Sequence, residues 1–147
     1  MSLNFKNVKK ILVPTDGSEI SLRAAEYGIS VAKMIGAQIV VVFVVDDVVL
    51  DQIAKITAHE VAERELKEDG KGYVNYVVGL AGKEGVNSSS LITEGRPFEQ
   101  IVHLAKELNA DLIVMGTYGR RGTDRILIGS VAERVIEYAP CPVLVIK

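Results

Sequence analysis

The sequence predicts an α/β fold: a single-domain, open five-stranded parallel sheet of strand order 3-2-1-4-5 with helices on both faces. Two observations favour this Rossmann-like class. Short apolar runs with strand character alternate along the chain with segments in which apolar residues recur at helical spacing. The run from Ile39 to Val45 is apolar throughout, as expected of a strand that helices cover on both faces of a parallel sheet. The strand order is the usual one for a sheet of this size and connectivity.

The first half of the chain contains two of the predicted strands. Ile11 to Val13 is a short apolar strand that ends in the turn from Pro14 to Ser18. Ser18 is a suitable N-cap for the helix that follows, and Gly36 is suited to end that helix. The strand from Ile39 to Val45 comes next.

The stretch from Val48 to Gly85 predicts one helix, with a kink or break near residue 70. Gly70 and Gly72 lie inside its helical spacing, and each glycine in a helix interior costs about 1 kcal/mol relative to alanine. Tyr73 and Tyr76 are expected to lie in the packing stripe of this helix.

The second half of the chain continues the alternation of strands and helices. Pro97 is suited to the first position of a helix, and Pro140 and Pro142 end the last helix before the final strand. The predicted segments are a strand at Ser88–Glu94, a helix from Pro97 to Leu108, a strand at Asp111–Met115, a connection from Gly116 to Gly129, a helix at Ser130–Tyr138 and a strand at Val143–Ile146.

Length and composition favour one soluble domain over residues 1–147. The 48% of apolar residues and 24% of charged residues suit a chain that buries a core. A net charge of −2 without a run of Lys or Arg argues against a nucleic-acid partner. No apolar stretch approaches the roughly 20 residues needed to cross a membrane, and no secretory signal is recognisable. Because the single cysteine, Cys141, cannot form an internal disulfide, we expect a cytoplasmic location.

Two turns of the predicted sheet are candidates for a binding site. Ligands of open parallel sheets bind beyond the carboxyl ends of the strands, where the strand order reverses. The turn from Pro14 to Ser18 and the connection from Gly116 to Ser130 are expected to face one another there. The connection contains Gly116, Gly119, Gly129 and Ser130 in the spacing G-x2-G-x9-G-S, for which chance gives an expectation of about 0.01 in this composition.

The glycines of this connection favour a phosphate-bearing ligand. Glycines let main-chain N–H groups approach anionic oxygens, and the N-terminus of the following helix adds free N–H donors. The spacing differs from that of a P-loop, and the sequence contains no Gly-Lys-Ser or Gly-Lys-Thr. The arginines at positions 120, 121 and 125 are weaker candidates for phosphate contacts.

Asp16 has two interpretations. It can cap the turn into the following helix, as turn aspartates commonly do. Its place at the carboxyl end of the first strand also suits it to accept hydrogen bonds from ribose hydroxyls, or to help hold Mg²⁺ through water.

Four segments resemble the universal stress protein family, in its ATP-binding branch. They are Val13–Ser18, Met115–Ser130, Gly129–Val135 and Pro140–Val145, and the similarity spans the whole chain. Two positions depart from the family pattern: Tyr118 stands where many relatives carry histidine, and Thr117 where many carry serine.

The resemblance implies a ligand and a set of residues that contact it. The ligand is ATP, with ADP or AMP as alternatives and Mg²⁺ as an optional companion. The phosphate side is implied to consist of Gly116, Gly119, Gly129, Ser130 and Val131. The remaining contacts are implied for Pro14, Thr15 and Asp16 beside the ribose or phosphates, Val44 at the base, and Met115 beside the sugar.

We therefore expect an ATP-binding regulatory or stress-response protein, with weak ATP hydrolysis at most, because no residue is placed as a general base. One alternative is a dimeric interaction module that binds no nucleotide. In both cases we expect a homodimer through Val143–Ile146, because an edge strand can pair with the same strand of a second copy. A slow Mg²⁺-dependent nucleotide hydrolase or transferase and a flavin-binding relative of the same sheet type are further alternatives.

Overall fold

The computed structural model describes residues 5–118 and 128–147. After a short 3-10 helix at Phe5–Asn7, strands and helices alternate, except that two consecutive helices lie between β2 and β3. The strands are β1 (Lys10–Pro14), β2 (Gln38–Asp46), β3 (Ser88–Gly95), β4 (Leu112–Gly116) and β5 (Val143–Ile146). The helices are α1 (Glu19–Ile35), α2 (Asp47–Ala54), α3 (His59–Lys83), α4 (Pro97–Glu107) and α5 (Ser130–Tyr138).

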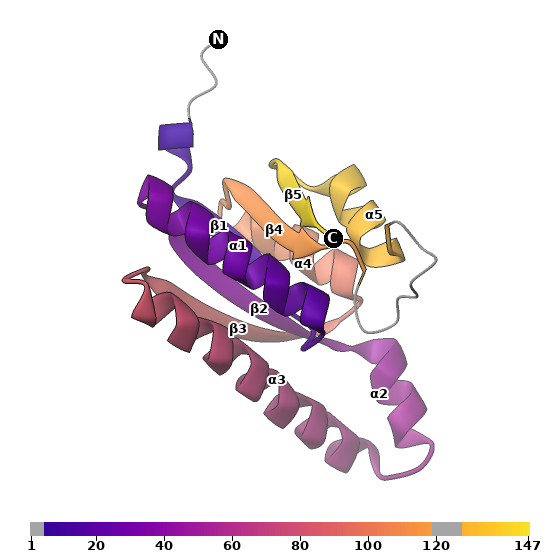
Figure 1. The fold of residues 1–147 in the computed structure, drawn as a ribbon. Coiled ribbons are helices and arrows are strands. Elements are labelled where there is room, and N and C mark those ends of the chain that lie inside the picture. Colours follow the sequence, from indigo (N-terminus) through magenta and orange to yellow (C-terminus); the bar gives the residue numbers. More distant parts are fainter. Residues whose placement is uncertain (1–4, 119–127) are drawn as a thin grey trace.

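The five strands form one parallel sheet in the order β3-β2-β1-β4-β5 (Figure 1). This confirms the predicted fold class and strand order. β1 lies at the centre, where Ile11 is in register with Ile39 of β2 and with Leu112 of β4. The strand order reverses at β1, so the carboxyl ends of β1 and β4 meet at the crevice where such sheets bind ligands.

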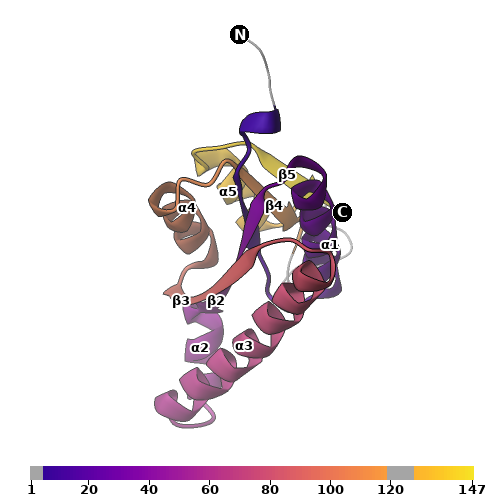
Figure 2. The same ribbon diagram turned by 90° about the vertical axis from the view of Figure 1, so that its left-hand side faces the viewer.

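Helices cover both faces of the sheet. Figures 1 and 2 show α1 and α3 on one face and α4 and α5 on the other. β2 demonstrates the consequence for sequence: Ile39, Val41 and Phe43 are buried beneath α1 and α3, while Val40 and Val42 are buried beneath α4 and α5. A strand between two helical layers needs apolar residues at consecutive positions, and this explains the unbroken run in β2.

The predicted ends of α1 and the predicted start of α4 are confirmed. The side chain of Ser18 accepts a hydrogen bond from the backbone N–H of Ser21 at the start of α1. Gly36 ends α1 in the left-handed conformation, with a φ of 74°. Pro97 occupies the first turn of α4.

The prediction for residues 48–85 is wrong in its details. The segment forms two helices, α2 and α3. The helical structure is interrupted at residues 55–58 rather than near residue 70. Gly70 lies within the continuous helix α3, where a Cβ atom would lie 2.7 Å from Cε1 of Phe43 and closer still to Cδ1. The glycine therefore lets α3 approach the sheet, and this tertiary contact outweighs its low helix propensity.

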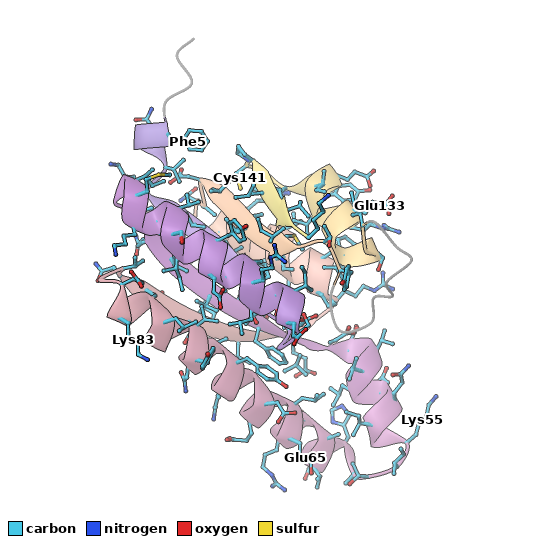
Figure 3. All side chains as sticks on the ribbon, in the orientation of Figure 1. Phe5, Lys55, Glu65, Lys83, Glu133 and Cys141 are labelled. Atoms are coloured by element: carbon cyan, nitrogen blue, oxygen red, sulfur yellow. The ribbon has the colours of Figure 1, made fainter. Side chains whose placement is uncertain are left out.

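The outer face of α3 is charged and solvated, as expected for a helix of this composition. Glu65 and Lys83 project away from the sheet (Figure 3). Lys67 donates to Glu63 at 2.6 Å, and this ion pair lowers the pKa of the Glu63 carboxyl. Tyr73 packs against the core as predicted, whereas Tyr76 is 57% exposed and lies outside the packing stripe.

None of the helices within residues 5–118 and 128–147 combines the length and apolar character needed to cross a membrane.

Candidate functional site

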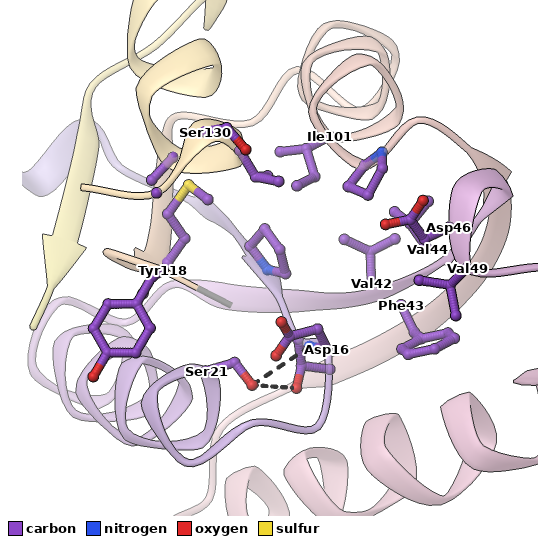
Figure 4. A pocket seen from close by; sticks show the side chains of 18 of the residues that line it. Asp16, Ser21, Val42, Phe43, Val44, Asp46, Val49, Ile101, Tyr118 and Ser130 are labelled. Carbon is purple, nitrogen blue, oxygen red and sulfur yellow. Dashed lines mark hydrogen bonds between the residues drawn. The ribbon is translucent and has the colours of Figure 1, made fainter. Parts of the chain in front are cut away.

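A cavity of about 220 Å³ opens at the carboxyl ends of β1, β2 and β4 (Figure 4). The structure brings together here the predicted site residues that it describes, and Gly119 lies outside the described residues. Those that line the cavity are Pro14, Thr15, Asp16, Val44, Met115, Gly116, Gly129, Ser130 and Val131. In Figure 4, Tyr118 and Ser130 lie toward one end, Asp46 and Val49 toward the other, and Asp16 between them.

The turn after β1 is held by hydrogen bonds from its own polar side chains and from Ser21 of α1. Thr15 and Ser21, both buried, are joined through their hydroxyl oxygens at 3.1 Å. The Ser21 hydroxyl donates to the Ser18 carbonyl at 2.9 Å and accepts from the Asp16 N–H at 3.4 Å. Thr15 also donates its backbone N–H to the Val42 carbonyl at 2.8 Å, which anchors the turn to β2.

The structure confirms the first interpretation of Asp16, as a cap of the turn into α1, and the contact with ribose or Mg²⁺ stays a prediction. Its Oδ1 accepts from the backbone N–H of Ser18 at 3.0 Å and from the Ser18 hydroxyl at 2.6 Å. These are the contacts of a turn-capping aspartate. The same residue lines the cavity, so the cap fixes a carboxylate at the cavity wall.

The connection from β4 to α5 is closed at its base. The backbone N–H of Gly129 donates to the carbonyl of Thr117, and Thr117 in turn donates its N–H to the Ile146 carbonyl at 2.8 Å. A Cβ atom on Gly129 would lie 3.0 Å from Tyr118 Cα and 3.1 Å from the Thr117 carbonyl oxygen. Glycine is favoured here because a Cβ atom would lie closer to the main chain of residues 117 and 118 than Cβ atoms usually do.

The N-terminus of α5 opens onto the cavity. Gly129 is its N-cap, and no side chain among the described residues caps the helix there. The first N–H groups of a helix carry a partial positive charge and have no intrahelical acceptor. Ser130 and Val131, in the first turn of α5, both line the cavity. This end of the cavity can therefore bind an anionic group such as a phosphate.

The opposite end of the cavity is mostly apolar. Val42, Phe43 and Val44 of β2 form one wall there, with Val49 of α2 and Leu66 of α3 beside them. Such a lining suits the faces of a flat ring system, because apolar walls with a few polar groups are typical of small-molecule sites.

Asp16 and Asp46 are the charged residues among the described residues that line the cavity. Asp46 is the N-cap of α2, where its Oδ1 accepts from the Val48 N–H at 3.0 Å. No group of three or more His, Cys, Asp or Glu side chains within the described segments is arranged to hold a metal ion. A metal at this site would therefore take most of its ligands from a bound molecule and from water.

Sequence reasoning missed several residues of the cavity. Asp46 carried a usable signal. It lies at the carboxyl end of β2, just as Asp16 lies after the carboxyl end of β1, and both strands end at the same edge of the sheet. Leu66 and Ile101 carried none: each has the apolar character and spacing of an ordinary core residue. Their place at the cavity follows from the packing of α3 and α4.

Cys141 lies outside this cavity. Burial, with a contribution from Asp111, raises the pKa of its thiol. A raised pKa disfavours the thiolate, which is the reactive form.

Fold and site together define a doubly wound α/β protein with a crevice suited to an anionic ligand that carries a ring system. The match to the model of the universal stress protein family extends over residues 7–147. A universal stress protein of Methanocaldococcus jannaschii, MJ0531, is 45% identical and covers 95% of this chain and 82% of its own length. The chain belongs to the universal stress protein family.

Solved structures agree with this assignment. The structure of the hypothetical protein MJ0577 superposes with a TM-score of 0.84 at 29% identity, covering 95% of this chain and 96% of its own. A universal stress protein from Archaeoglobus fulgidus, solved in complex with dAMP, superposes with a TM-score of 0.66 at 25% identity, covering 95% and 98%. A relative of the same fold thus binds an adenine nucleotide.

Proposed function

We propose that the protein is an ATP-binding regulatory protein of the cytoplasm whose nucleotide occupancy changes its shape or its partners. One observation carries the proposal: a single cavity is bordered by the Asp16 carboxylate, the N-terminus of α5 and the apolar wall of β2. The dAMP complex of the A. fulgidus relative supports an adenine nucleotide as the ligand class.

The proposed nucleotide lies along the cavity with its phosphates at Gly129 and Ser130. There the N–H groups at the start of α5 and the Ser130 hydroxyl donate to phosphate oxygens. Gly116 and Val131 border the same end, and Gly119 is proposed to contribute a further N–H. Met115 lies beside the sugar in this arrangement.

The base of the proposed nucleotide lies against Val44, at the apolar end of the cavity. Pro14, Thr15 and Asp16 border the middle, where the Asp16 carboxylate accepts hydrogen bonds from the ribose hydroxyls. Apolar contact with the ring and charge-assisted hydrogen bonds to the sugar then act together.

Mg²⁺ fits this proposal as a companion of the phosphates. Asp16 and Asp46 give the described lining a negative charge, which disfavours a free triphosphate. Mg²⁺ binds oxygen ligands, keeps several waters and commonly joins one carboxylate to substrate phosphates. The Asp16 carboxylate at the cavity wall meets that requirement.

Replacement of Asp16 by asparagine tests the role of the carboxylate. The Asp16→Asn side chain keeps an oxygen for the Ser18 N–H but loses the charge. We expect binding of Mg²⁺–ATP, measured by isothermal titration calorimetry, to weaken by at least about tenfold, because charge-assisted hydrogen bonds are roughly twice as strong as neutral ones.

Asp51→Asn is the matched control, because Asp51 is exposed on α2 and does not line the cavity. Its affinity for ATP should equal that of the unchanged protein. Tighter binding by Asp16→Asn would mean that the carboxylate only repels the phosphates. The proposed function itself fails if the unchanged protein shows no saturable binding of ATP, ADP or AMP, and sustained release of phosphate would indicate a hydrolase instead.

A homodimer through β5 is a second proposal, supported by the position of this strand. β5 lies at the edge of the sheet and pairs with β4 on one side. Pro142 accepts a hydrogen bond from Ile113 of β4, and Ile146 accepts one from Thr117, which follows β4. The alternation along a strand therefore directs the backbone groups of Val143 and Val145 outward. Leu144, which lies between them in β5, is 38% exposed. Pairing with a second β5 would satisfy these groups.

Replacement of Val145 by proline tests this dimer. Proline removes one outward N–H and fills its place with a ring, while edge strands otherwise tolerate it. We expect Val145→Pro to be a monomer and Val145→Thr, which keeps the N–H and the branched shape, to remain a dimer in light scattering at micromolar concentration. A monomer mass for the unchanged protein, or a dimer for Val145→Pro, would contradict the proposed interface.

A further inference from the structure

Helix α3 contacts the walls of the nucleotide cavity along one face. Leu66 lines the cavity, Gly70 lies against Phe43 of β2, and Tyr73 lies against Gly17 of the turn after β1. The spacings of four and three residues place 66, 70 and 73 on the same side of the helix. α3 therefore meets both the apolar wall and the turn that carries Asp16.

The contact between Tyr73 and Gly17 is unusually close. A Cβ atom on Gly17 would lie 2.7 Å from Cε1 of Tyr73 and closer still to Cζ and Cε2. The ring therefore lies directly on the main chain of the turn. Gly17 also has a φ of 83°, a conformation that other residues adopt only with strain. Both facts fix glycine at the position that follows Asp16.

The Tyr73 ring is itself held in place. Its centroid lies 5.8 Å from that of Phe43, with an angle of 51° between the rings. Phe43 is 4% exposed, packs against the backbone of α3 at Gly70 and lines the cavity. An unbroken series of contacts thus runs from the cavity wall through Phe43 and Tyr73 to the turn of Asp16.

We propose that Tyr73 is a positioning residue of the nucleotide site, acting through its ring on Gly17 to hold the Asp16 carboxylate at the cavity wall. The expected effect of Tyr73 on nucleotide binding rests on the proposed function. If the tyrosine only filled the core, its replacement would destabilise all parts of the domain to the same extent. A tyrosine that rests on the backbone of a functional turn has its main effect on that turn.

Local hydrogen exchange tests the inference without any ligand. The Gly17 N–H donates to the Thr15 hydroxyl at 3.4 Å, and the Ser18 N–H donates to Asp16 Oδ1 at 3.0 Å, so both amides report on the turn. We expect Tyr73→Leu to speed their exchange by about tenfold relative to core amides of β2, since loss of a local contact favours local opening. Tyr73→Phe keeps the ring and should exchange at the original rate.

Tyr76→Leu is the matched control, because Tyr76 is on the same helix, is largely exposed and does not line the cavity. It should leave the exchange of Gly17 and Ser18 unchanged. Titration with Mg²⁺–ATP should then give about tenfold weaker binding for Tyr73→Leu and unchanged affinity for Tyr73→Phe and Tyr76→Leu, a difference well within calorimetric resolution.

The outcomes separate this inference from the proposed function. If the unchanged protein binds no nucleotide, the proposed function fails, and the exchange of the turn amides still decides the role of Tyr73. Unaltered exchange in Tyr73→Leu, equal acceleration throughout β2, or an equal effect of Tyr73→Phe would overturn the inference.

A second measurement applies if Tyr73→Leu does not fold. The protein labelled with 3-fluorotyrosine carries five reporters, and Tyr73→Phe identifies the signal of Tyr73. On addition of Mg²⁺–ATP that signal should shift while the signal of Tyr76 stays in place. Bound nucleotide without a shift of the Tyr73 signal would overturn the inference.

Discussion

Replacement of Gly70 by alanine is expected to lower the free energy of unfolding by about 2–3 kcal/mol, because overpacking a well-packed core costs about 1–3 kcal/mol or more. The new methyl group would meet the ring of Phe43, which also contacts the ring of Tyr73, one turn further along α3. The sign is the informative part, since glycine to alanine inside a helix normally stabilises by about 1 kcal/mol. Urea unfolding followed by circular dichroism measures the change.

Gly72→Ala and Gly79→Ala are matched controls in the same helix. Both positions are exposed, and a Cβ atom at either would meet nothing within 4 Å. Each control should raise the free energy of unfolding by about 0.5–1 kcal/mol. If Gly70→Ala stabilised the protein as the controls do, the close approach of α3 to Phe43 would be refuted.

Replacement of Gly129 by alanine is expected to weaken ATP binding by about 10- to 100-fold, which corresponds to roughly 1.4–2.8 kcal/mol. The methyl group would press on main-chain atoms of Thr117 and Tyr118, which cannot rotate away as a side chain does. Gly129 has a φ of −74°, so alanine adds no backbone strain, and the effect arises from widening the base of the connection. Calorimetric titration with ATP measures it.

The same titration on Gly79→Ala provides the control, because that glycine lies in open space on α3 and does not line the cavity. Thermal unfolding of Gly129→Ala should show a cooperative transition, which separates loss of the site from loss of the fold. Unchanged ATP affinity in Gly129→Ala would show that the closed base of the connection is not needed for binding.

The fold was predictable because its strongest signals are local. The unbroken apolar run of β2 and the caps at Ser18 and Gly36 each follow from the immediate neighbours in sequence. The boundary between α2 and α3 was not predictable, because residues 55–58 contain neither glycine nor proline. Gly70 was misinterpreted for the opposite reason: its role depends on Phe43, 27 positions earlier in the chain.

The candidate site was predictable where it lies on the turns that follow the strands. Asp16 and Gly129 could be placed because parallel strands bring their carboxyl ends to one edge of the sheet. The contribution of α3 could not be placed, since the packing of Leu66 and Tyr73 depends on the angle at which a long helix crosses the sheet. No spacing within α3 records that angle.

The length of α3 has a mechanical consequence. From Leu66 at the cavity to Lys83 near its end, the helix runs about 25 Å at 1.5 Å per residue. Just beyond that end, Glu84 accepts from Lys33 of α1 at 2.7 Å. A tilt of about 5° around the first end displaces the second by about 2 Å over this length. Any tilt of α3 at the cavity would therefore be largest at the end of the helix next to Lys33 of α1.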